Sequence, residues 1–174
     1  VNITRELTMT AVPEYVEGHN LLRGKSVLIT AAAGAGIGFA TAKRAVEEGA
    51  RAIIVSDVHE ARLEGAIESL VGLNKDTKIE GHICDVTSEK SVQALVQTAE
   101  ASLSGVDILI NNAGLGGSRS LVDMSDEDWF KVMDVTLTGT MRMTRAMLGF
   151  MYQRGSGVIV NNASVLGWRA QRDQ

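Results

Sequence analysis

The chain has 174 residues, 45% of them hydrophobic and 22% charged, with a formal net charge of −4 at pH 7 and a pI near 5.4. Its length and composition are those of one globular domain, and its acidic balance argues against nucleic acid or an anionic membrane as partner. The sequence has neither an apolar run long enough to span a membrane nor a secretory signal. The single cysteine, Cys84, excludes an internal disulfide and favours the cytoplasm. No metal site is predicted.

Residues 1–24 show no regular period and are expected to form an N-terminal arm, followed by one nucleotide-binding domain over 25–174. From Lys25 onward, short apolar runs alternate with amphipathic stretches. The predicted strands are 26–30, 50–57, 78–85, 106–114 and 157–164. The predicted helices are 36–48, 59–70, 88–103 and a long helix over 126–152. Ser125 with Asp128, and Thr87 or Ser88, are the expected N-terminal caps.

The strand runs are almost continuously apolar, as in strands that helices cover on both faces. Their alternation with helices predicts parallel strands joined by right-handed crossovers. We therefore expect an α/β fold with three layers: a doubly wound, Rossmann-type parallel sheet in the strand order 3-2-1-4-5 with helices on both faces.

A glycine-rich turn, T-A-A-A-G-A-G-I-G, runs from Thr30 to Gly38 between the first predicted strand and the first helix. Glycines at this place let the backbone approach a pyrophosphate, and the helix start supplies free N–H groups and partial positive charge. The alternative is a tight strand-to-helix turn without a ligand. The position after the first strand of a βαβ unit favours dinucleotide binding.

Asp57 stands at the end of the second predicted strand. A carboxylate there accepts hydrogen bonds from both adenosine ribose hydroxyls and repels a 2′-phosphate. No Arg or Lys lies in the turn to bind that phosphate, because Ala35 precedes Gly36. NAD is therefore predicted in preference to NADP. Asp57 can also cap the second helix, and the two roles are compatible.

Four elements follow one another along the chain: the glycine-rich turn, Asp85-Val86, the N-N-A-G ending at Gly114, and the N-N-A-S ending at Ser164. In this order and spacing they resemble the short-chain dehydrogenases/reductases, and the resemblance extends from about Leu22 to the last residue. The runs NNAGLGG and NNASVLGWRAQ are similar to a bacterial subgroup described as 3-oxoacyl-[acyl-carrier-protein] reductase-like, some members of which act in steroid-ring breakdown.

The resemblance implies roles for individual residues. The segment that holds the pyrophosphate corresponds to Gly34, Gly36, Ile37 and Gly38. The aspartate that bonds the adenine amine corresponds to Asp85, with Val86 against the ring. The segment that lines the adenosine ribose and steadies the sheet corresponds to Asn112, Ala113 and Gly114. The serine that hydrogen-bonds the substrate oxygen corresponds to Ser164.

Each of these positions has a structural alternative. Asp85 can cap a helix, Asn111 and Asn112 can form a buried amide pair at a strand end, and Ser164 can be a turn serine. The apolar residues of the long helix are expected in the core or at a subunit interface rather than against substrate; they are Trp129, Met133, Leu137, Met141 and Leu148.

Two residues depart from the family pattern. Ala32 stands where the family's turn normally begins with glycine, which predicts a slightly altered turn because alanine disfavours a left-handed backbone. Thr136 stands where the family carries an asparagine that holds a water in a proton relay. A threonine hydroxyl can replace that amide only in part.

The resemblance implies hydride transfer between nicotinamide and a substrate carbon, with a tyrosine as general base and a lysine four residues later that lowers its pKa. Counted from Ser164, that tyrosine falls just past Gln174. Neither Tyr15 nor Tyr152 stands in a Y-x-x-x-K sequence. The 174 residues are therefore expected to be an inactive piece of a longer enzyme, with an exposed last strand.

The predicted function is an NAD-dependent oxidoreductase acting on a secondary alcohol or ketone. The residues expected around the substrate, Leu115–Ser118 and Val165–Trp168, are small or apolar apart from Ser118, which favours a hydrophobic alcohol or ketone over a sugar. The resemblance to the 3-oxoacyl-[acyl-carrier-protein] reductase-like subgroup implies an acyl-thioester or steroid-like substrate. The alternative is a non-catalytic dinucleotide-binding sensor or scaffold. The family's use of the long helix between subunits predicts a homodimer or homotetramer through 126–152.

Overall fold

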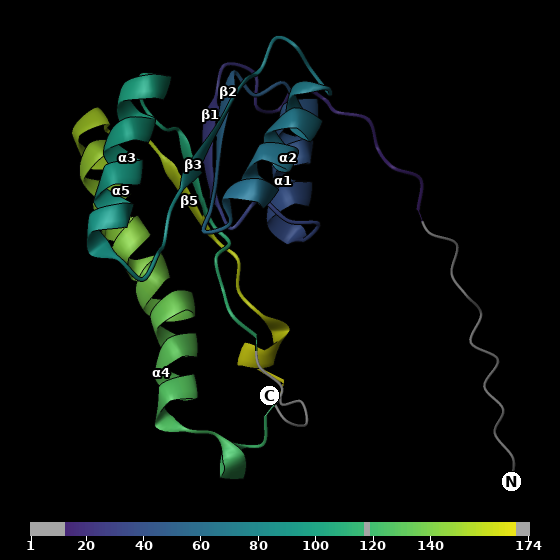
Figure 1. The fold of residues 1–174 in the computed structure, drawn as a ribbon. Helices are drawn as coiled ribbons and strands as arrows, with labels where there is room; N and C mark the ends of the chain where they lie inside the picture. Colours follow the sequence, from purple (N-terminus) through teal and green to yellow (C-terminus); the bar gives the residue numbers. More distant parts are fainter. Residues whose placement is uncertain (1–12, 117–118, 170–174) are drawn as a thin grey trace, which may run out of the picture.

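The computed structural model describes residues 13–116 and 119–169. In this part of the chain, strands and helices alternate from Ser26 onward (Figure 1). The strands are β1 Ser26–Thr30, β2 Ala52–Asp57, β3 Lys78–Ile83, β4 Ile108–Asn111 and β5 Val158–Asn161. The α-helices are α1 Ile37–Glu47, α2 Glu60–Val71, α3 Glu89–Leu103, α4 Asp126–Met133 and α5 Gly139–Arg154.

The five strands form one parallel sheet in the order β3-β2-β1-β4-β5, which confirms the predicted topology. The chain starts in the middle of the sheet, moves outward to β3, and then crosses to β4 and β5 on the other side of β1. The strand order therefore reverses between β1 and β4. Ligands of open α/β sheets bind at this place, beyond the carboxyl ends of the strands.

Helices cover both faces of the sheet: α1 and α2 lie on one face, and α3 and α5 lie on the other (Figure 1). Each face buries its own apolar cluster. The side chains of Val27, Ile29 and Ile53 pack toward α1 and α2, whereas Leu28 and Leu109 pack toward α3 and α5. Alternate residues of β1 thus enter opposite layers, which is why its sequence is apolar at nearly every position.

The outer strands are less buried than the sequence pattern predicts. β1 is fully buried along its length, but most of β3 is only partly buried and most of β5 is exposed. In β3, the polar residues Lys78, Glu80 and His82 lie on one side; Glu80 forms an ion pair with Lys78 and a hydrogen bond with His82. Among the described residues, β5 pairs only with β4, so it is the exposed edge that the sequence predicts.

The predicted long helix is interrupted. Residues Asp134–Thr138 form a π-helical turn between α4 and α5. A π-turn inserts one extra residue into a helix and is frequent at functional sites. Thr136, the residue that departs from the family pattern, lies at the centre of this turn.

The caps of the later helices agree with the prediction. The Ser88 hydroxyl accepts a hydrogen bond from Ser91 N at the start of α3, which decides between Thr87 and Ser88. The Ser125 hydroxyl accepts one from Asp128 N at the start of α4.

The described part of the N-terminal arm, residues 13–24, is tied to the end of α1. Glu48 Oε2 accepts hydrogen bonds from Leu21 N at 3.1 Å and from His19 N at 2.8 Å. These backbone donors, together with Arg44, lower the pKa of Glu48. Arg23 forms an isolated antiparallel bridge with Ala50 just before β2. The arm therefore runs along the outside of α1, away from the carboxyl ends of the strands. Among the described residues, no helix has the length and apolar character needed to cross a membrane.

Candidate functional site

The glycine-rich turn leaves the start of α1 open. Gly36 is the N-cap of α1 and has no side chain to accept the first N–H groups of the helix. At Gly38, a Cβ atom would lie 2.4 Å from Ala31 O and 2.5 Å from Asn112 Nδ2, so only glycine fits there. At Gly36, by contrast, a Cβ atom would meet nothing within 4 Å. The turn thus presents free backbone N–H donors, as binding of a pyrophosphate requires. We call this group of donors, at Gly36–Gly38, the pyrophosphate cradle.

The turn differs from the expectation in one detail. The residue in the left-handed region is Ala31, with φ of 51°, rather than Ala32. Ala32 is fully buried, and its N–H donates to Ser56 O at 3.1 Å, so its small side chain is accommodated in the core. The backbone strain therefore lies at Ala31 and not at Ala32, the alanine at the family's first glycine position.

Asp57 connects the end of β2 to the turn. Its Oδ2 accepts a hydrogen bond from Ala33 N at 3.3 Å, and its Oδ1 accepts one from His59 N at 3.2 Å. His59 is the N-cap of α2, so Asp57 braces the approach to that helix without capping it. The carboxylate lies beside the turn, where a ribose bound next to the pyrophosphate would reach it.

Asp85 and Val86 follow β3 at the same edge of the sheet. Asp85 Oδ1 accepts hydrogen bonds from Thr87 N at 2.8 Å and Thr87 Oγ1 at 2.7 Å, and it therefore stabilises the turn before α3. Asp85 is exposed, and its Oδ2 makes no hydrogen bond to a described residue. Val86 is only 6% exposed and packs on Gly139, where a Cβ atom would lie 2.8 Å from Val86 Cγ2. Contact of Val86 with an adenine would thus come mainly from its backbone.

Asn112 joins the central strands. Its Nδ2 donates to Thr30 O at 3.1 Å and to Ala31 O at 3.0 Å, and its Oδ1 accepts from Asn162 Nδ2 at 2.9 Å. Thr30 Oγ1 accepts from both Asn112 N and Ala113 N at 2.9 Å. The Asn112 side chain thus stabilises the central strands through these hydrogen bonds.

Asn111 forms a second amide cluster on the opposite face of the sheet. Its Nδ2 donates to Thr144 Oγ1 at 3.0 Å and to Asn161 Oδ1 at 2.9 Å, while its buried Oδ1 has no partner among the described atoms. Asn111 and Asn161 are register partners in β4 and β5. This cluster fastens α5 to the last strand pair.

Ser164 lines a cavity of about 700 Å³ at the carboxyl ends of β4 and β5. Its Oγ accepts a hydrogen bond from Leu166 N at 3.2 Å and begins a short 3₁₀ turn, Val165–Gly167. The serine therefore holds a turn and lines the cavity at the same time. The cavity brings together Ser164 with residues of the glycine-rich turn, the N-N-A-G segment and α4: Ile37, Asn112, Gly114, Leu115, Gly116, Met124, Trp129, Val132, Met133, Thr136, Asn162, Ala163, Val165 and Leu166.

Thr136 is brought into this cavity by the π-turn. Its Oγ1 accepts a hydrogen bond from Leu115 N at 3.1 Å, so it anchors the loop that follows Gly114. The sequence predicts a relay role for Thr136; the structure gives its hydroxyl a bond to the backbone.

Two groups of residues lie in the cavity without having been predicted there. Trp129 and Met133 were predicted in the core or at a subunit interface; Trp129 is 48% exposed, and both line the cavity that contains Ser164. Their spacing with Val132 and Thr136, at positions i, i+3, i+4 and i+7, places all four on one face of the helix, and this signal was readable in advance. Asn162 received no role from the sequence, yet it bonds Asn112 and lines the same cavity. Of the predicted substrate residues, 117–118 lie outside the described residues.

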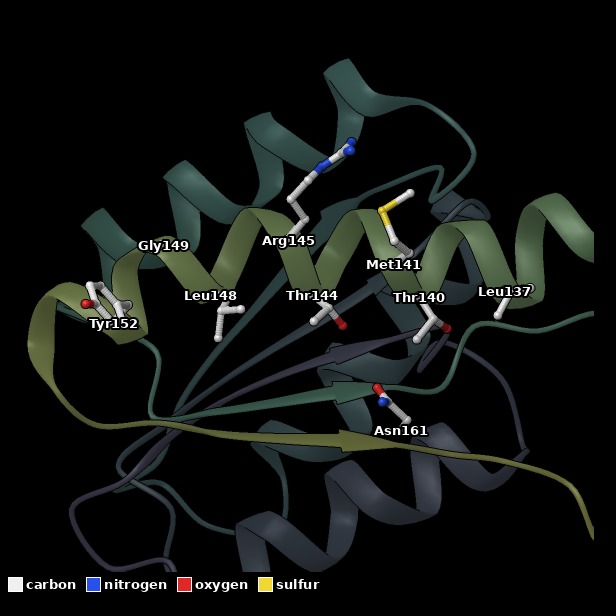
Figure 2. A pocket seen from close by; sticks show the side chains of 9 residues that line it. All are labelled: Leu137, Thr140, Met141, Thr144, Arg145, Leu148, Gly149, Tyr152 and Asn161. Atoms are coloured by element: carbon white, nitrogen blue, oxygen red, sulfur yellow. The ribbon is translucent and has the colours of Figure 1, made fainter.

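A second hollow lies along α5 and the edge strand (Figure 2). Leu137, Thr140 and Leu148 point toward the strand side, and Asn161 faces them from β5. Leu137, Met141 and Leu148 are 60%, 44% and 52% exposed, so these predicted core or interface residues are not buried within the described chain. The groove is about 770 Å³ in volume and almost wholly apolar in its lining.

Charged side chains lie beside the cavity that contains Ser164, and none of those in the described part of the chain lines it. Asp128 accepts a hydrogen bond from Ser125 Oγ and pairs with Arg119, and these contacts, the Ser125 bond first, lower the pKa of Asp128. No group of three or more metal-ligating side chains occurs within 13–116 and 119–169.

The family model described as short chain dehydrogenase matches residues 25–173. The chain is 50% identical over 171 residues to the (5R,7aS)-5-hydroxy-7a-methyl-1-oxo-2,3,5,6,7,7a-hexahydro-1H-indene-carboxyl-CoA reductase of Mycobacterium tuberculosis, covering 97% of this chain and 64% of that relative.

Two solved structures are similar to this chain in sequence and in fold. A short chain dehydrogenase from Mycobacterium smegmatis has 52% identity and a TM-score of 0.86, over 93% of this chain and 67% of that one. The NAD+-bound xylitol dehydrogenase has 34% identity and a TM-score of 0.82, over 88% of this chain and 58% of that one. With its sheet topology, glycine-rich turn and serine-lined cavity, the chain belongs to the short-chain dehydrogenase family.

Proposed function

We propose that these residues form the dinucleotide-binding part of an NAD(H)-dependent oxidoreductase that transfers a hydride between nicotinamide and a secondary alcohol or ketone. The observation that supports this best is the shared cavity: Ser164 and Asn162, which follow β5, line one space together with Gly114 and with Ile37, the residue of the glycine-rich turn at which α1 begins. A cofactor lying from the turn toward Ser164 would bring its reactive ring to that serine.

Each part of the site has one task. The open N–H groups at Gly36, Ile37 and Gly38 would bind the pyrophosphate, with Gly34 leaving room beside it. The cofactor, when bound, supplies the hydride chemistry. Ser164 Oγ would donate a hydrogen bond to the substrate oxygen and fix the carbon that reacts. Neither Tyr15 nor Tyr152 has a lysine four residues later, so these 174 residues do not supply the family's general base.

NAD is proposed over NADP because Asp57 puts a negative charge beside the turn. Its two carboxylate oxygens are held by the N–H groups of Ala33 and His59, so the carboxylate is fixed in place. A 2′-phosphate at this position would meet like charge without a basic side chain in the turn.

The substrate is proposed to be hydrophobic, an acyl thioester or a steroid-like ketone. The cavity wall opposite Ser164 consists of Met124, Trp129, Val132 and Met133, none of them charged. The mycobacterial relative is described as acting on a bicyclic indene-carboxyl-CoA compound, which combines both features.

The test is a binding and turnover experiment on the 174-residue chain and, where the coding sequence continues past Gln174, on the longer product. NADH binding is followed by fluorescence and by calorimetry. Turnover is followed by NADH oxidation with a bicyclic ketone and its thioester. Binding of NADH with reduction of the ketone by the longer product supports the proposal; absence of NADH binding from both proteins overturns it.

A dinucleotide-binding sensor is the second candidate, and Thr136 favours it, because this threonine stands where the family carries the asparagine of the proton relay. A sensor would bind NADH and NAD+ with different affinities and reduce no ketone. A polarising serine such as Ser164 has no purpose in a sensor, which is why the enzyme is preferred.

We further propose that the protein works in the cytoplasm as a homodimer or homotetramer. The α5 groove, with Leu137, Met141, Leu148 and Tyr152 exposed, is the surface we assign to this assembly. The buried free thiol of Cys84 suits a reducing compartment. Sedimentation of Leu148→Glu against the parent protein tests the assembly.

A further inference from the structure

Asn161 and Asn162 are adjacent asparagines whose side chains lie on opposite faces of the sheet, as successive residues of a strand do. Asn161 Oδ1 accepts from Asn111 Nδ2, on the face that α5 covers. Asn162 Nδ2 donates to Asn112 Oδ1, and Asn162 lines the cavity that Ser164 shares with the glycine-rich turn. Chemically equal side chains thus reach two different environments.

Most hydrogen-bonding positions of the Asn112 amide are occupied. Its Nδ2 donates to Thr30 O and Ala31 O, and its Oδ1 accepts from Asn162. Both donors are therefore engaged, and only the second lone pair of Oδ1 is left for a ligand. The N-N-A-G asparagine therefore acts on the cofactor site through the backbone that it holds.

The side chain of Asn162, by contrast, has most of its hydrogen-bonding positions free. Within the described part of the chain its side chain makes one hydrogen bond, the donation to Asn112, which leaves the second N–H and Oδ1 for other partners. Asn162 is exposed in the cavity, two residues before Ser164. A free donor and a free acceptor thus stand next to the proposed catalytic serine.

We propose that Asn162 is a cofactor-binding residue for the nicotinamide half of the dinucleotide, through hydrogen bonds to its ribose hydroxyls or carboxamide. This rests on the proposed function, because the position of the nicotinamide is set by Ser164. The pyrophosphate belongs at Gly36–Gly38 and the adenosine at Asp57, so the half of the cofactor that extends toward Ser164 passes Asn162.

The same residue links the two halves of the site. The path Asn162–Asn112–Ala31 consists of hydrogen bonds of 2.9 and 3.0 Å and crosses from β5 over β4 to the residue that opens the turn after β1. Asn162 is therefore positioned relative to the pyrophosphate cradle by direct bonds rather than by packing alone.

The experiment compares two ligands on one variant. NADH contains the nicotinamide half, whereas ADP has the same adenosine and pyrophosphate but lacks both the nicotinamide ring and the ribose that carries it. Asn162→Leu keeps the size of the side chain and removes its hydrogen bonds. Dissociation constants are measured by calorimetry on the 174-residue chain and on any longer product. We expect NADH binding to weaken about tenfold and ADP binding to change less than twofold, as the loss of one or two hydrogen bonds predicts.

Asn161→Asp is the matched control, because it keeps the acceptor for Asn111 and lies on the other face. It should leave the ratio of the two dissociation constants unchanged. Equal weakening of both ligands by Asn162→Leu, or no weakening of either, overturns the inference while leaving the proposed function intact. If Asn162→Leu does not fold, Asn162→Ala is measured in the same way. Failure of the parent protein to bind NADH at all overturns the proposed function itself.

Discussion

Asp57 Oδ2 accepts a hydrogen bond from Ala33 N at 3.3 Å, which joins the end of β2 to the glycine-rich turn after β1. The same carboxylate is held from its other side by His59 N. A charge fixed in this way cannot move aside to admit a second anion. We therefore expect the proposed preference for NAD over NADP to depend on this side chain.

Removing the charge tests that dependence. In Asp57→Asn, Oδ1 can still accept from His59 N, the bond from Ala33 N to the second oxygen is lost, and the like-charge repulsion of a 2′-phosphate disappears. We expect the dissociation constant for NADPH to fall about tenfold relative to that for NADH, because such repulsion costs on the order of kilocalories per mole. Calorimetric titration of both cofactors measures the ratio. An unchanged ratio would show that Asp57 does not discriminate between them.

Two glycines of the same turn are expected to respond differently to alanine. In Gly38→Ala the new Cβ would lie 2.4 Å from Ala31 O, so the turn must shift, at about 1–3 kcal/mol of unfolding free energy. In Gly36→Ala the methyl group meets no protein atom within 4 Å, so stability is kept, but the group occupies the pyrophosphate cradle. Urea denaturation and NADH titration separate the two effects.

Gly149→Ala is the control for both variants. Gly149 lies inside α5, where an added Cβ has open space. It should raise the unfolding free energy by about 0.5–1 kcal/mol and leave NADH binding as it is. If Gly36→Ala binds NADH as the parent does, the cradle is not the pyrophosphate site.

The sequence predicted the sheet because its signals are local. A β-branched run such as Val27–Ile29 and a glycine-rich turn act within a few residues, and so do the caps Ser88 and Ser125. The ordered motifs then identified the family and the end of the sheet where the site lies. Interruption of the long helix at Thr136 carries no such local signal, because a π-turn has no fixed residue preference.

The hydrogen bonds between asparagine side chains could not be predicted either, and the reason is different. Asn112 and Asn162 are 50 positions apart, and their bond depends on the register of β4 against β5. Shifting that register by one residue would exchange the faces of Asn161 and Asn162. The left-handed residue was likewise assigned to Ala32 instead of Ala31, because the exact start of a turn is set by its contacts with Asn112 and Ser56.

The buried cluster around Asn111 yields a prediction on stability. Thr144→Val is nearly isosteric but removes the hydroxyl that accepts from Asn111 Nδ2, leaving a buried N–H without a partner. The unfolding free energy should fall by about 1–3 kcal/mol. Thr140→Val is the control, because the Thr140 hydroxyl donates to Thr136 O on an exposed part of the helix. Equal stabilities of the two variants in urea would mean that the Asn111 amide is satisfied in another way.

The charged row on β3 predicts a dependence of stability on pH. Partial burial acts to raise the pKa of Glu80, but the hydrogen bonds from Lys78, Ser102 and His82 outweigh it and lower that pKa to about 2 from 4.5. A carboxyl whose pKa is lower in the folded state stabilises the fold above its unfolded pKa and loses this contribution as pH falls. Glu80 should therefore contribute fully above about pH 5 and progressively less between 4.5 and 2.

Glu80→Gln isolates this contribution, because it retains the shape of the side chain and removes the charge. At pH 7 the variant should be less stable than the parent by about 1–2 kcal/mol, after allowance for solvent screening of a partly exposed group. The difference should shrink as the pH is lowered through 4.5 toward 3, because the carboxyl of the unfolded parent is then protonated while the folded one is still ionised, so that unfolding takes up a proton. Glu64→Gln, on the exposed side of α2, should show no difference at any pH. Urea denaturation at pH 7, 4.5 and 3 checks the series, and a difference that stays constant with pH would contradict the lowered pKa of Glu80.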